Sequence, residues 1–214
     1  GPSHRYVASK HRTAGEIGIR SVGVELPATA TQAQVEAEVA RLATDASVHG
    51  ILVQMPLPGH LDPERVLALI PAAKDVDGLT EASLGRLVRG VPGHVGCTPL
   101  GVMRLLDHYG ITTSGRRAAV VGRSTLVGLP MALLLAQKGV DATVTLAHSR
   151  TADMVAVCRE ADIIVSATGI ARSITAAHVK PGAAVIDVGI SRTDAGIVGD
   201  VDFDGVQGVA GAVT

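Results

Sequence analysis

The second half of the chain alternates short apolar runs with helical patterns, and this alternation restricts the possible fold more than any other feature. Four apolar runs have the length of buried strands: 116–122, 140–149, 161–169 and 181–190. Helical patterns separate them: one begins near Pro130, one covers 151–161 and a short one lies near 175–179. Parallel strands joined by helices are buried on both faces and are therefore almost continuously apolar. The second half predicts a doubly wound parallel sheet of the nucleotide-binding type.

The first half also predicts an α/β unit. A helix is expected over 3–17, a second after a Thr31 cap, and a third where Asp62 precedes Pro63 at a first helical position. Strands are expected at 19–26 and 50–57. Helices alternating with strands indicate a parallel sheet here too.

The boundary between the two domains is expected near residue 97. The segment 74–98 is rich in glycine, proline and short polar turns, with one short helix near 81–88. Thr98-Pro99 repeats the cap-plus-proline signal and predicts a connector helix through Leu106. We therefore expect a catalytic α/β domain over 1–97 and a nucleotide-binding domain over 98–214.

Composition excludes several classes of function. The 214 residues are 47% hydrophobic and 18% charged, as in a globular protein, and the formal net charge of −1 gives no electrostatic basis for binding nucleic acid or an anionic membrane. No apolar run approaches membrane-spanning length, and the opening residues do not resemble a signal peptide. The histidines lack metal-ligand spacing, and Cys97 and Cys158 lie far apart, so we expect no metal, unpaired cysteines and a soluble, cytoplasmic protein.

The stretch VVGRSTLVGLP (120–130) connects the first strand of the second half to its first helix, where open parallel sheets bind ligands. Gly122 and Gly128 stand six apart without the middle glycine of the usual dinucleotide fingerprint, and neither a P-loop nor a nucleophile elbow is formed. Ser124 supplies a hydroxyl, Arg123 a planar cation, and Gly128 allows helix and strand to approach closely. The alternative is a turn with only a structural purpose.

The end of the second strand bears on the choice of cofactor. NAD-selective folds place a carboxylate here for the ribose 2′-hydroxyl, but this chain has His148-Ser149-Arg150. A hydroxyl beside a guanidinium suits a 2′-phosphate, which favours NADP. The alternative is a polar turn in which Ser149 or Thr151 caps the next helix.

The first half contains polar residues in unusual places. Tyr6 and Lys10 are one helical turn apart and can serve a common ligand, although a solvated surface lysine is the alternative. Gln54 interrupts an apolar strand and must bond either to neighbouring backbone or to a ligand. Asp75 and Asp77 precede Gly78, where Asx-turn chemistry is the alternative to a site, and two carboxylates alone make a poor metal site.

Taken together, several stretches resemble one known family. YVASK, GILVQMPLP, KDVDG, CTPLGVM, VVGRSTLVGLPMALLL, HSRT, PGAAVIDVGI and GDVDF occur in this order. The chain is similar throughout to the bifunctional methylenetetrahydrofolate dehydrogenase/methenyltetrahydrofolate cyclohydrolase (FolD) family. The resemblance implies two α/β domains joined by long helices with a cleft between them, a folate-binding first domain, a Rossmann-like NADP domain and a homodimer.

The resemblance also implies roles for single residues. Lys10 is the implied catalytic lysine, Gln54 its hydrogen-bond partner, Tyr6 the stacking partner of the aminobenzoyl ring and Asp77 the residue that holds the pterin. For the cofactor it implies phosphate contacts from Gly122, Arg123 and Ser124, a 2′-phosphate contact from Ser149 and a nicotinamide contact from Ile190.

The implied chemistry has two steps: hydride leaves the one-carbon bridge of 5,10-methylenetetrahydrofolate for NADP, and water then converts the methenyl cation to 10-formyltetrahydrofolate. The second step needs proton transfers, yet a lysine in water has a pKa of about 10.4. We expect partial desolvation to ease proton loss, with an uncharged amide orienting the amine.

Two departures and two alternatives accompany this interpretation. Relative to the family, we expect the first domain to lack its opening helix and strand, and the second its C-terminal return segment. The alternatives are an NADP-dependent dehydrogenase of another small metabolite and a catalytically silent scaffold, since a fold alone does not establish catalysis.

Overall fold

The computed structural model describes residues 2–193 and 196–214, without the side chains of residues 2–6. The chain forms two compact units, Gly1–Val76 and Asp77–Thr214, so the structural division comes before the expected boundary at residue 97. Residues 77–97 belong to the second unit because their side chains and backbone pack there: Leu87 is buried in its core, and its carbonyl accepts a hydrogen bond from Gln137 Nε2 at 3.3 Å.

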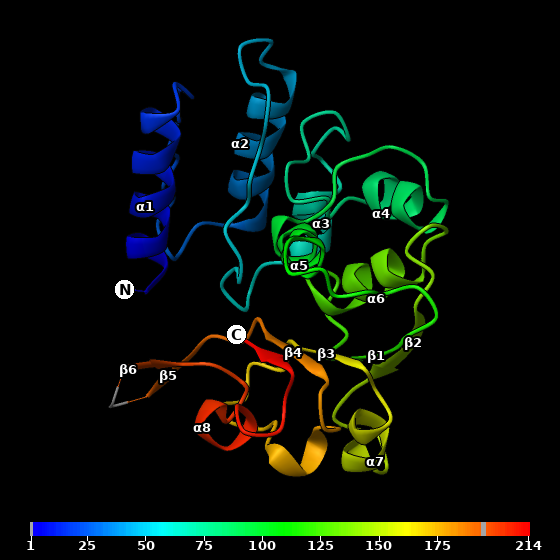
Figure 1. Cartoon of the computed structure of the whole chain (residues 1–214). Helices are drawn as coiled ribbons and strands as arrows, with labels where there is room; N and C mark the ends of the chain where they lie inside the picture. Colours follow the sequence, from blue (N-terminus) through cyan, green and yellow to red (C-terminus); the bar gives the residue numbers. More distant parts are fainter. Residues whose placement is uncertain (1, 194–195) are drawn as a thin grey trace. The chain divides into compact units, whose positions relative to one another are not determined.

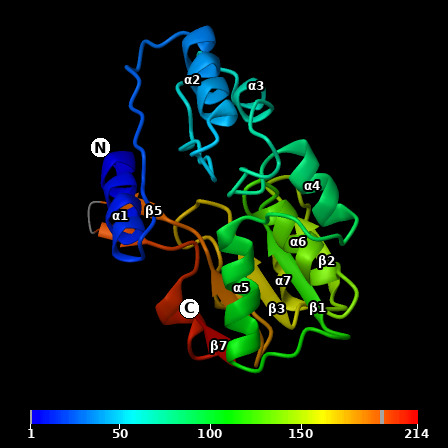
Figure 2. The same cartoon turned by 90° about the horizontal axis from the view of Figure 1, so that it is seen from above.

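A five-stranded sheet forms the centre of the second unit (Figure 1, and from above in Figure 2). Its strands are β1 (Arg117–Val121), β2 (Thr143–Ala147), β3 (Ile163–Ser166), β4 (Ala184–Asp187) and β7 (Ala212–Val213). The order is β2-β1-β3-β4-β7 and every neighbouring pair is parallel. The four strands expected from the apolar runs are confirmed, and β7 is added at the edge.

Helices cover both faces of this sheet, with α6 on one side and α7 on the other in Figure 1. The first face is covered by α4 (Glu81–Val88), α5 (Cys97–His108) and α6 (Gly128–Ala136); the second by α7 (Met154–Arg159), the 3₁₀ helix η1 (Ala176–His178) and α8 (Phe203–Val206). Alternate β1 residues enter the two cores, since Ala118 and Val120 pack on the first face and Ala119 and Val121 on the second. The predicted doubly wound architecture is confirmed.

A small hairpin follows β4. Its strands β5 (Ser191–Thr193) and β6 (Gly196–Val198) are antiparallel. Ile190 and Ile197 are 72% and 67% exposed. The apolar pattern of the sequence did not predict this hairpin, because each strand has only three residues and those of β5 are all polar.

The described residues of the first unit, 2–76, form three helices: α1 (Pro2–Glu16), α2 (Gln32–Thr44) and α3 (Pro63–Leu67). The predicted caps of α2 and α3 are confirmed. Thr31 forms a capping box with Gln34, and Asp62 accepts from the first turn of α3, whose first residue is Pro63. Val35 and Val39 form the buried face of α2.

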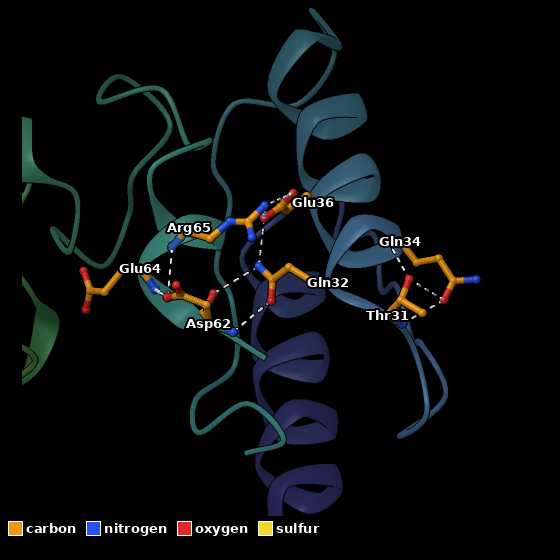
Figure 3. A network of polar contacts seen from close by, with 7 residues as sticks. All are labelled: Thr31, Gln32, Gln34, Glu36, Asp62, Glu64 and Arg65. Atoms are coloured by element: carbon orange, nitrogen blue, oxygen red, sulfur yellow. Dashed lines mark hydrogen bonds and ion pairs between the residues drawn. The ribbon is translucent and has the colours of Figure 1, made fainter. Parts of the chain in front are cut away.

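A network of polar side chains joins α2 to α3 (Figure 3). Gln32 exchanges two hydrogen bonds with the backbone of Asp62: its Nε2 donates to the carbonyl at 3.2 Å, and its Oε1 accepts from the N–H at 2.8 Å. Arg65 forms an ion pair with Glu36 at 2.9 Å. These contacts fix the N-terminal end of α3 beside α2, and the amide pair does so in one orientation only.

The strands expected at 19–26 and 50–57 are wrong. Within the described chain, these residues form no ladder, and the second segment contributes one parallel bridge, from Ile51 to Asp75. Val22, Val24 and Leu26 are 40–55% exposed. An apolar run shows that a segment can pack as a strand, but a strand also needs a partner for its backbone groups. Within the described residues, no strand pairs with the first segment, and the second pairs only at the single Ile51–Asp75 bridge.

The N-terminus of α5 also differs from expectation. Gly96, not Thr98, is the N-cap residue, and the helix begins at Cys97. Gly96 is buried, and a β-carbon there would approach the carbonyl oxygens of Asp77 and Leu126 to 3.3 Å. Close packing of the backbone at Gly96 therefore determines where this helix begins. The Thr98-Pro99 pattern does not determine it.

Lys74 stabilises the end of α2, and its replacement by methionine is expected to destabilise the first unit. Its Nζ donates to three backbone carbonyls: Leu42 (3.3 Å), Ala43 (2.7 Å) and Asp45 (2.8 Å). Charge-assisted hydrogen bonds of this kind contribute about 1.5–3 kcal/mol, and a cation also suits a helix C-terminus. Urea unfolding followed by circular dichroism measures the loss. Lys138→Met, on the exposed surface of the second unit, is the control and should change the free energy of unfolding by less than about 0.5 kcal/mol.

Candidate functional site

The loop after β1 contains two glycines that the backbone requires. Gly122 has φ +122°, and a β-carbon on it would collide with the carbonyl oxygen of Ala167. A β-carbon on Gly128, the first residue of α6, would collide with the carbonyl oxygen of Gly122. The expectation that Gly128 lets helix and strand approach is thus confirmed. The N-terminus of α6 lies directly at the carboxyl edge of the sheet, where helix dipoles favour anions.

Ser124 and Arg123 lie in this loop and are both exposed. Ser124 Oγ accepts a hydrogen bond from Val127 N at 3.2 Å, and the Ser124 carbonyl accepts from Leu129 N at 3.0 Å. The serine therefore shapes the turn that leads into α6, while its hydroxyl hydrogen is available for donation. Arg123 adds a positive charge to the same turn.

The turn after β2 holds Ser149 on the surface. Thr151 Oγ1 accepts from His148 N at 3.0 Å, and His148 Nδ1 accepts from Arg150 N at 3.1 Å. Asp153 caps α7 by accepting from Ala156 N at 2.9 Å. The alternative in which Ser149 or Thr151 caps this helix is wrong, because a carboxylate two residues further on takes that position.

Lys10 and Gln54 are brought together within the first unit. Lys10 lies on α1 and Gln54 in a segment without regular secondary structure, and both are half-buried. Lys10 Nζ donates to Gln54 Oε1 at 3.4 Å, while Gln54 Nε2 donates to the carbonyl of Met55 at 2.9 Å. Because the amide nitrogen is held by Met55, the amide oxygen faces the lysine. The side chain of Tyr6, on the same helix, lies outside the described residues.

The two aspartates of KDVDG are in different surroundings. Asp75 is 2% exposed and pairs through its backbone with Ile51, whereas Asp77 is half-buried. Gly78 has φ +66°, as the expected turn requires, and a β-carbon there would collide with the backbone of His94 and Val95. In the part of the chain that the structure describes, no three His, Cys, Asp or Glu side chains could together hold a metal ion.

Both cysteines are free thiols. Cys97 is exposed at the start of α5, while burial raises the pKa of Cys158 to about 11. A helix able to cross a membrane is absent from the described residues.

Sequence reasoning gave no role to two acidic residues at the carboxyl edge of the sheet. Asp187 ends β4, and Asp200 is completely buried. Their signal was present in the stretches PGAAVIDVGI and GDVDF, but a single carboxylate beside glycines does not distinguish a turn from a buried network.

The second unit has a glycine-bearing loop at the carboxyl edge of a parallel sheet, which defines a dinucleotide-binding domain. The first unit contributes the Lys10 amine, which donates a hydrogen bond to the Gln54 amide. Residues 96–214 match the family description "Tetrahydrofolate dehydrogenase/cyclohydrolase, NAD(P)-binding domain", and residues 1–77 match the catalytic domain of the same family. The chain belongs to the tetrahydrofolate dehydrogenase/cyclohydrolase family.

Individual relatives agree with this membership. The bifunctional protein FolD of Paracidovorax citrulli is 51% identical over 213 residues, which are 99% of this chain and 75% of that protein. The crystal structure of FolD from Campylobacter jejuni matches with a TM-score of 0.95 at 42% identity, over all of this chain and 76% of the other. The Trypanosoma brucei enzyme, solved with NADP cofactor and inhibitor, matches with a TM-score of 0.93 at 41% identity, covering 100% and 75%.

The α/β fold class predicted from sequence, with a catalytic domain followed by an NAD(P)-binding domain, is confirmed. The chain has the methylenetetrahydrofolate dehydrogenase and cyclohydrolase activities of one-carbon folate metabolism. It acts on tetrahydrofolate derivatives with a nicotinamide dinucleotide.

Proposed function

We propose that the chain oxidises 5,10-methylenetetrahydrofolate with NADP and then hydrolyses the methenyl product to 10-formyltetrahydrofolate, as a cytoplasmic homodimer. Two observations support NADP over NAD. The turn after β2 presents Ser149 and Arg150 and has Asp153 engaged in capping α7, and the Trypanosoma brucei relative was solved with NADP. A hydroxyl and a guanidinium are suited to a 2′-phosphate.

Several residues of the second unit are proposed to bind the cofactor. The backbone at Gly122 and the side chains of Arg123 and Ser124 contact the phosphates, Ser149 contacts the 2′-phosphate, and Ile190 contacts the nicotinamide. Support comes from their place at or just beyond the carboxyl ends of β1, β2 and β4, where open α/β sheets bind dinucleotides. When bound, the cofactor supplies the hydride acceptor.

Lys10 is proposed as the proton-transfer residue of the cyclohydrolase step, and its hydrogen bond to Gln54 is the observation that carries the proposal. Water adds to the methenyl carbon and loses one proton, which leaves a hydroxyl on that carbon. When the bond from this carbon to the ring nitrogen breaks, the nitrogen takes a proton and the hydroxyl loses its own, so that the formyl carbonyl forms and one proton is released overall. A half-buried amine can accept the first proton and return one to the leaving nitrogen. Gln54 orients this amine without adding charge.

Tyr6 and Asp77 are proposed to hold the folate. A tyrosine one turn before Lys10 can stack on the aminobenzoyl ring, and a carboxylate can accept hydrogen bonds from the amino and ring N–H groups of the pterin. Asp77 is half-buried and followed by a glycine in a left-handed conformation, so its backbone is fixed.

A spectrophotometric assay tests the function directly. Methylenetetrahydrofolate is supplied with NADP or NAD, and the formation and decay of the methenyl product are followed. Both phases, with NADP preferred, are the expected result. Formation without decay contradicts the role of Lys10, and a preference for NAD contradicts the proposed 2′-phosphate contact.

Ser149→Asp is expected to raise the KM for NADP at least about tenfold and to leave the KM for NAD nearly unchanged, because a carboxylate repels the 2′-phosphate at short range. Steady-state kinetics with each cofactor measure the change. Ser114→Asp, which adds the same charge at an exposed position before β1, is the matched control and should affect neither cofactor. An equal loss with both cofactors would count against a 2′-phosphate site at Ser149.

A further inference from the structure

Asp200 is a buried carboxylate that holds the loop after β3. It is 0% exposed, and its Oδ2 accepts three hydrogen bonds: Ser166 Oγ (3.1 Å), Thr168 N (2.6 Å) and Gly169 N (3.2 Å). Among the described side chains, its Oδ1 is the buried polar atom left without a hydrogen-bond partner. Burying an acceptor without a hydrogen bond costs free energy of folding. A buried carboxylate of this kind therefore calls for an explanation in terms of function.

The carboxylate of Asp187, at the end of β4, holds the backbone of the segment that contains Asp200. Its Oδ1 accepts from Gly189 N at 2.8 Å and from Asp200 N at 3.0 Å, and its Oδ2 accepts from Val201 N at 2.8 Å. The backbone around Asp200 is therefore fixed by Asp187, while the Asp200 side chain fixes the loop after β3.

Two glycines make this arrangement possible. A β-carbon on Gly189 would collide with the carboxylate of Asp200, and a β-carbon on Gly199 would collide with that of Asp187. Each carboxylate thus lies against a glycine beside the other aspartate. The reciprocal packing shows that both acids occupy defined positions.

The loops held by this pair lead to the proposed cofactor residues. The carbonyl oxygen of Ala167, next to Thr168, lies where a β-carbon of Gly122 would stand. Ser191 Oγ donates to the carbonyl of Gly169 at 3.1 Å, which ties the residue after Ile190 to the same loop. The Asp200 carboxylate therefore sets the position of backbone that contacts both the phosphate-binding turn and the nicotinamide end.

We propose that Asp200, supported by Asp187, is a positioning residue of the dehydrogenase reaction, which fixes the loops after β3 and β4 so that the cofactor is held in register for hydride transfer. The inference rests on the proposed binding of NADP along Gly122 and Ile190. Because Asp200 is 0% exposed, it acts through Thr168 and Gly169 and not by contact with cofactor or folate.

Asp200→Asn tests this proposal in the whole chain. The amide keeps the shape of the carboxylate but loses charge on the oxygen that accepts three hydrogen bonds, and small displacements of a reacting group cost up to about 100-fold in rate. We expect kcat/KM for NADP in methylene oxidation to fall at least about tenfold, in part through a higher KM for NADP. Cyclohydrolase activity, measured on methenyltetrahydrofolate supplied directly, should stay within about twofold, since Lys10 and Gln54 lie in the first unit.

Asp204→Asn, an exposed acid on α8, is the matched control and should leave both activities unchanged. Ser191→Ala is the milder variant if Asp200→Asn fails to fold, and should raise the KM for NADP about threefold, the size expected for one lost hydrogen bond, without affecting cyclohydrolysis. A parallel fall of both activities, or no change in kcat/KM for NADP, overturns the positioning role. A wild-type chain inactive with NADP instead overturns the proposed function.

Discussion

Replacing Lys10 by methionine is expected to lower the cyclohydrolase rate by about 10²–10⁴-fold, the usual contribution of a positioned acid–base group, and to leave NADP binding intact. Methionine fills similar space but cannot accept or return a proton. The amide oxygen of Gln54, which the amine contacts at 3.4 Å, loses this donor. The decay of methenyltetrahydrofolate measures the rate, and fluorescence titration with NADPH measures cofactor binding.

Lys10→Arg separates charge from proton transfer. Arginine keeps the cation and can still donate to Gln54, but it is not deprotonated in proteins. The variant is expected to be nearly as inactive in hydrolysis as Lys10→Met. Normal hydrolysis by either variant would assign the proton transfers to another group, and near-normal hydrolysis by the arginine variant alone would make Lys10 an electrostatic residue.

The second unit could be predicted closely from the sequence because its signals are local. The apolar runs at 116–122 and 161–169 are long enough to be recognised, and they become β1 and β3. The Asp62-Pro63 cap likewise depends on neighbouring residues alone, and it forms as expected. β7, with only Ala212 and Val213, has no such length and is defined by its pairing with β4.

The first unit was predicted less well because strand formation depends on a partner. Val22 and Val24 alternate with other residues as in a strand, yet both are exposed. Alternation shows which side chains would share one face of a strand, but it does not show whether another segment packs on that face. The beginning of α5 was misplaced for a related reason. Gly96 packs against the backbone of Asp77 and Leu126, and a pattern of neighbouring residues does not show contacts with residues so far along the chain.

Some residues of the candidate site could likewise be predicted from their neighbours in the sequence, and others could not. The residues of one loop, Gly122 to Ser124, could be found from their place after a strand. The contact of Lys10 with Gln54 joins residues 44 positions apart, and spacing alone could not show it. Asp200 was missed because its role arises from four segments meeting at the sheet edge: the ends of β3 and β4, the loop at Gly189 and its own turn.

Gly128→Ala is expected to abolish dehydrogenase activity and to destabilise the second unit by at least about 2–3 kcal/mol, because the new methyl group would overlap backbone atoms of Gly122 and Arg123. Neither neighbour can yield as a flexible side chain would. The helix must move away from β1, and the turn proposed to bind the cofactor phosphates moves with it. Thermal unfolding and methenyl formation with NADP measure the two effects.

The matched control is Gly101→Ala on α5, where a β-carbon would meet no atom within 4 Å. The same substitution there should stabilise the chain by about 0.5–1 kcal/mol, because alanine is the better helix former. If glycine-to-alanine lowers stability at position 128 and raises it at position 101, helix propensity does not explain the effect at Gly128. The close approach of α6 to the backbone of Gly122 then does. If Gly128→Ala instead kept both stability and dehydrogenase activity, the turn after β1 could not be the rigid phosphate site that NADP binding requires.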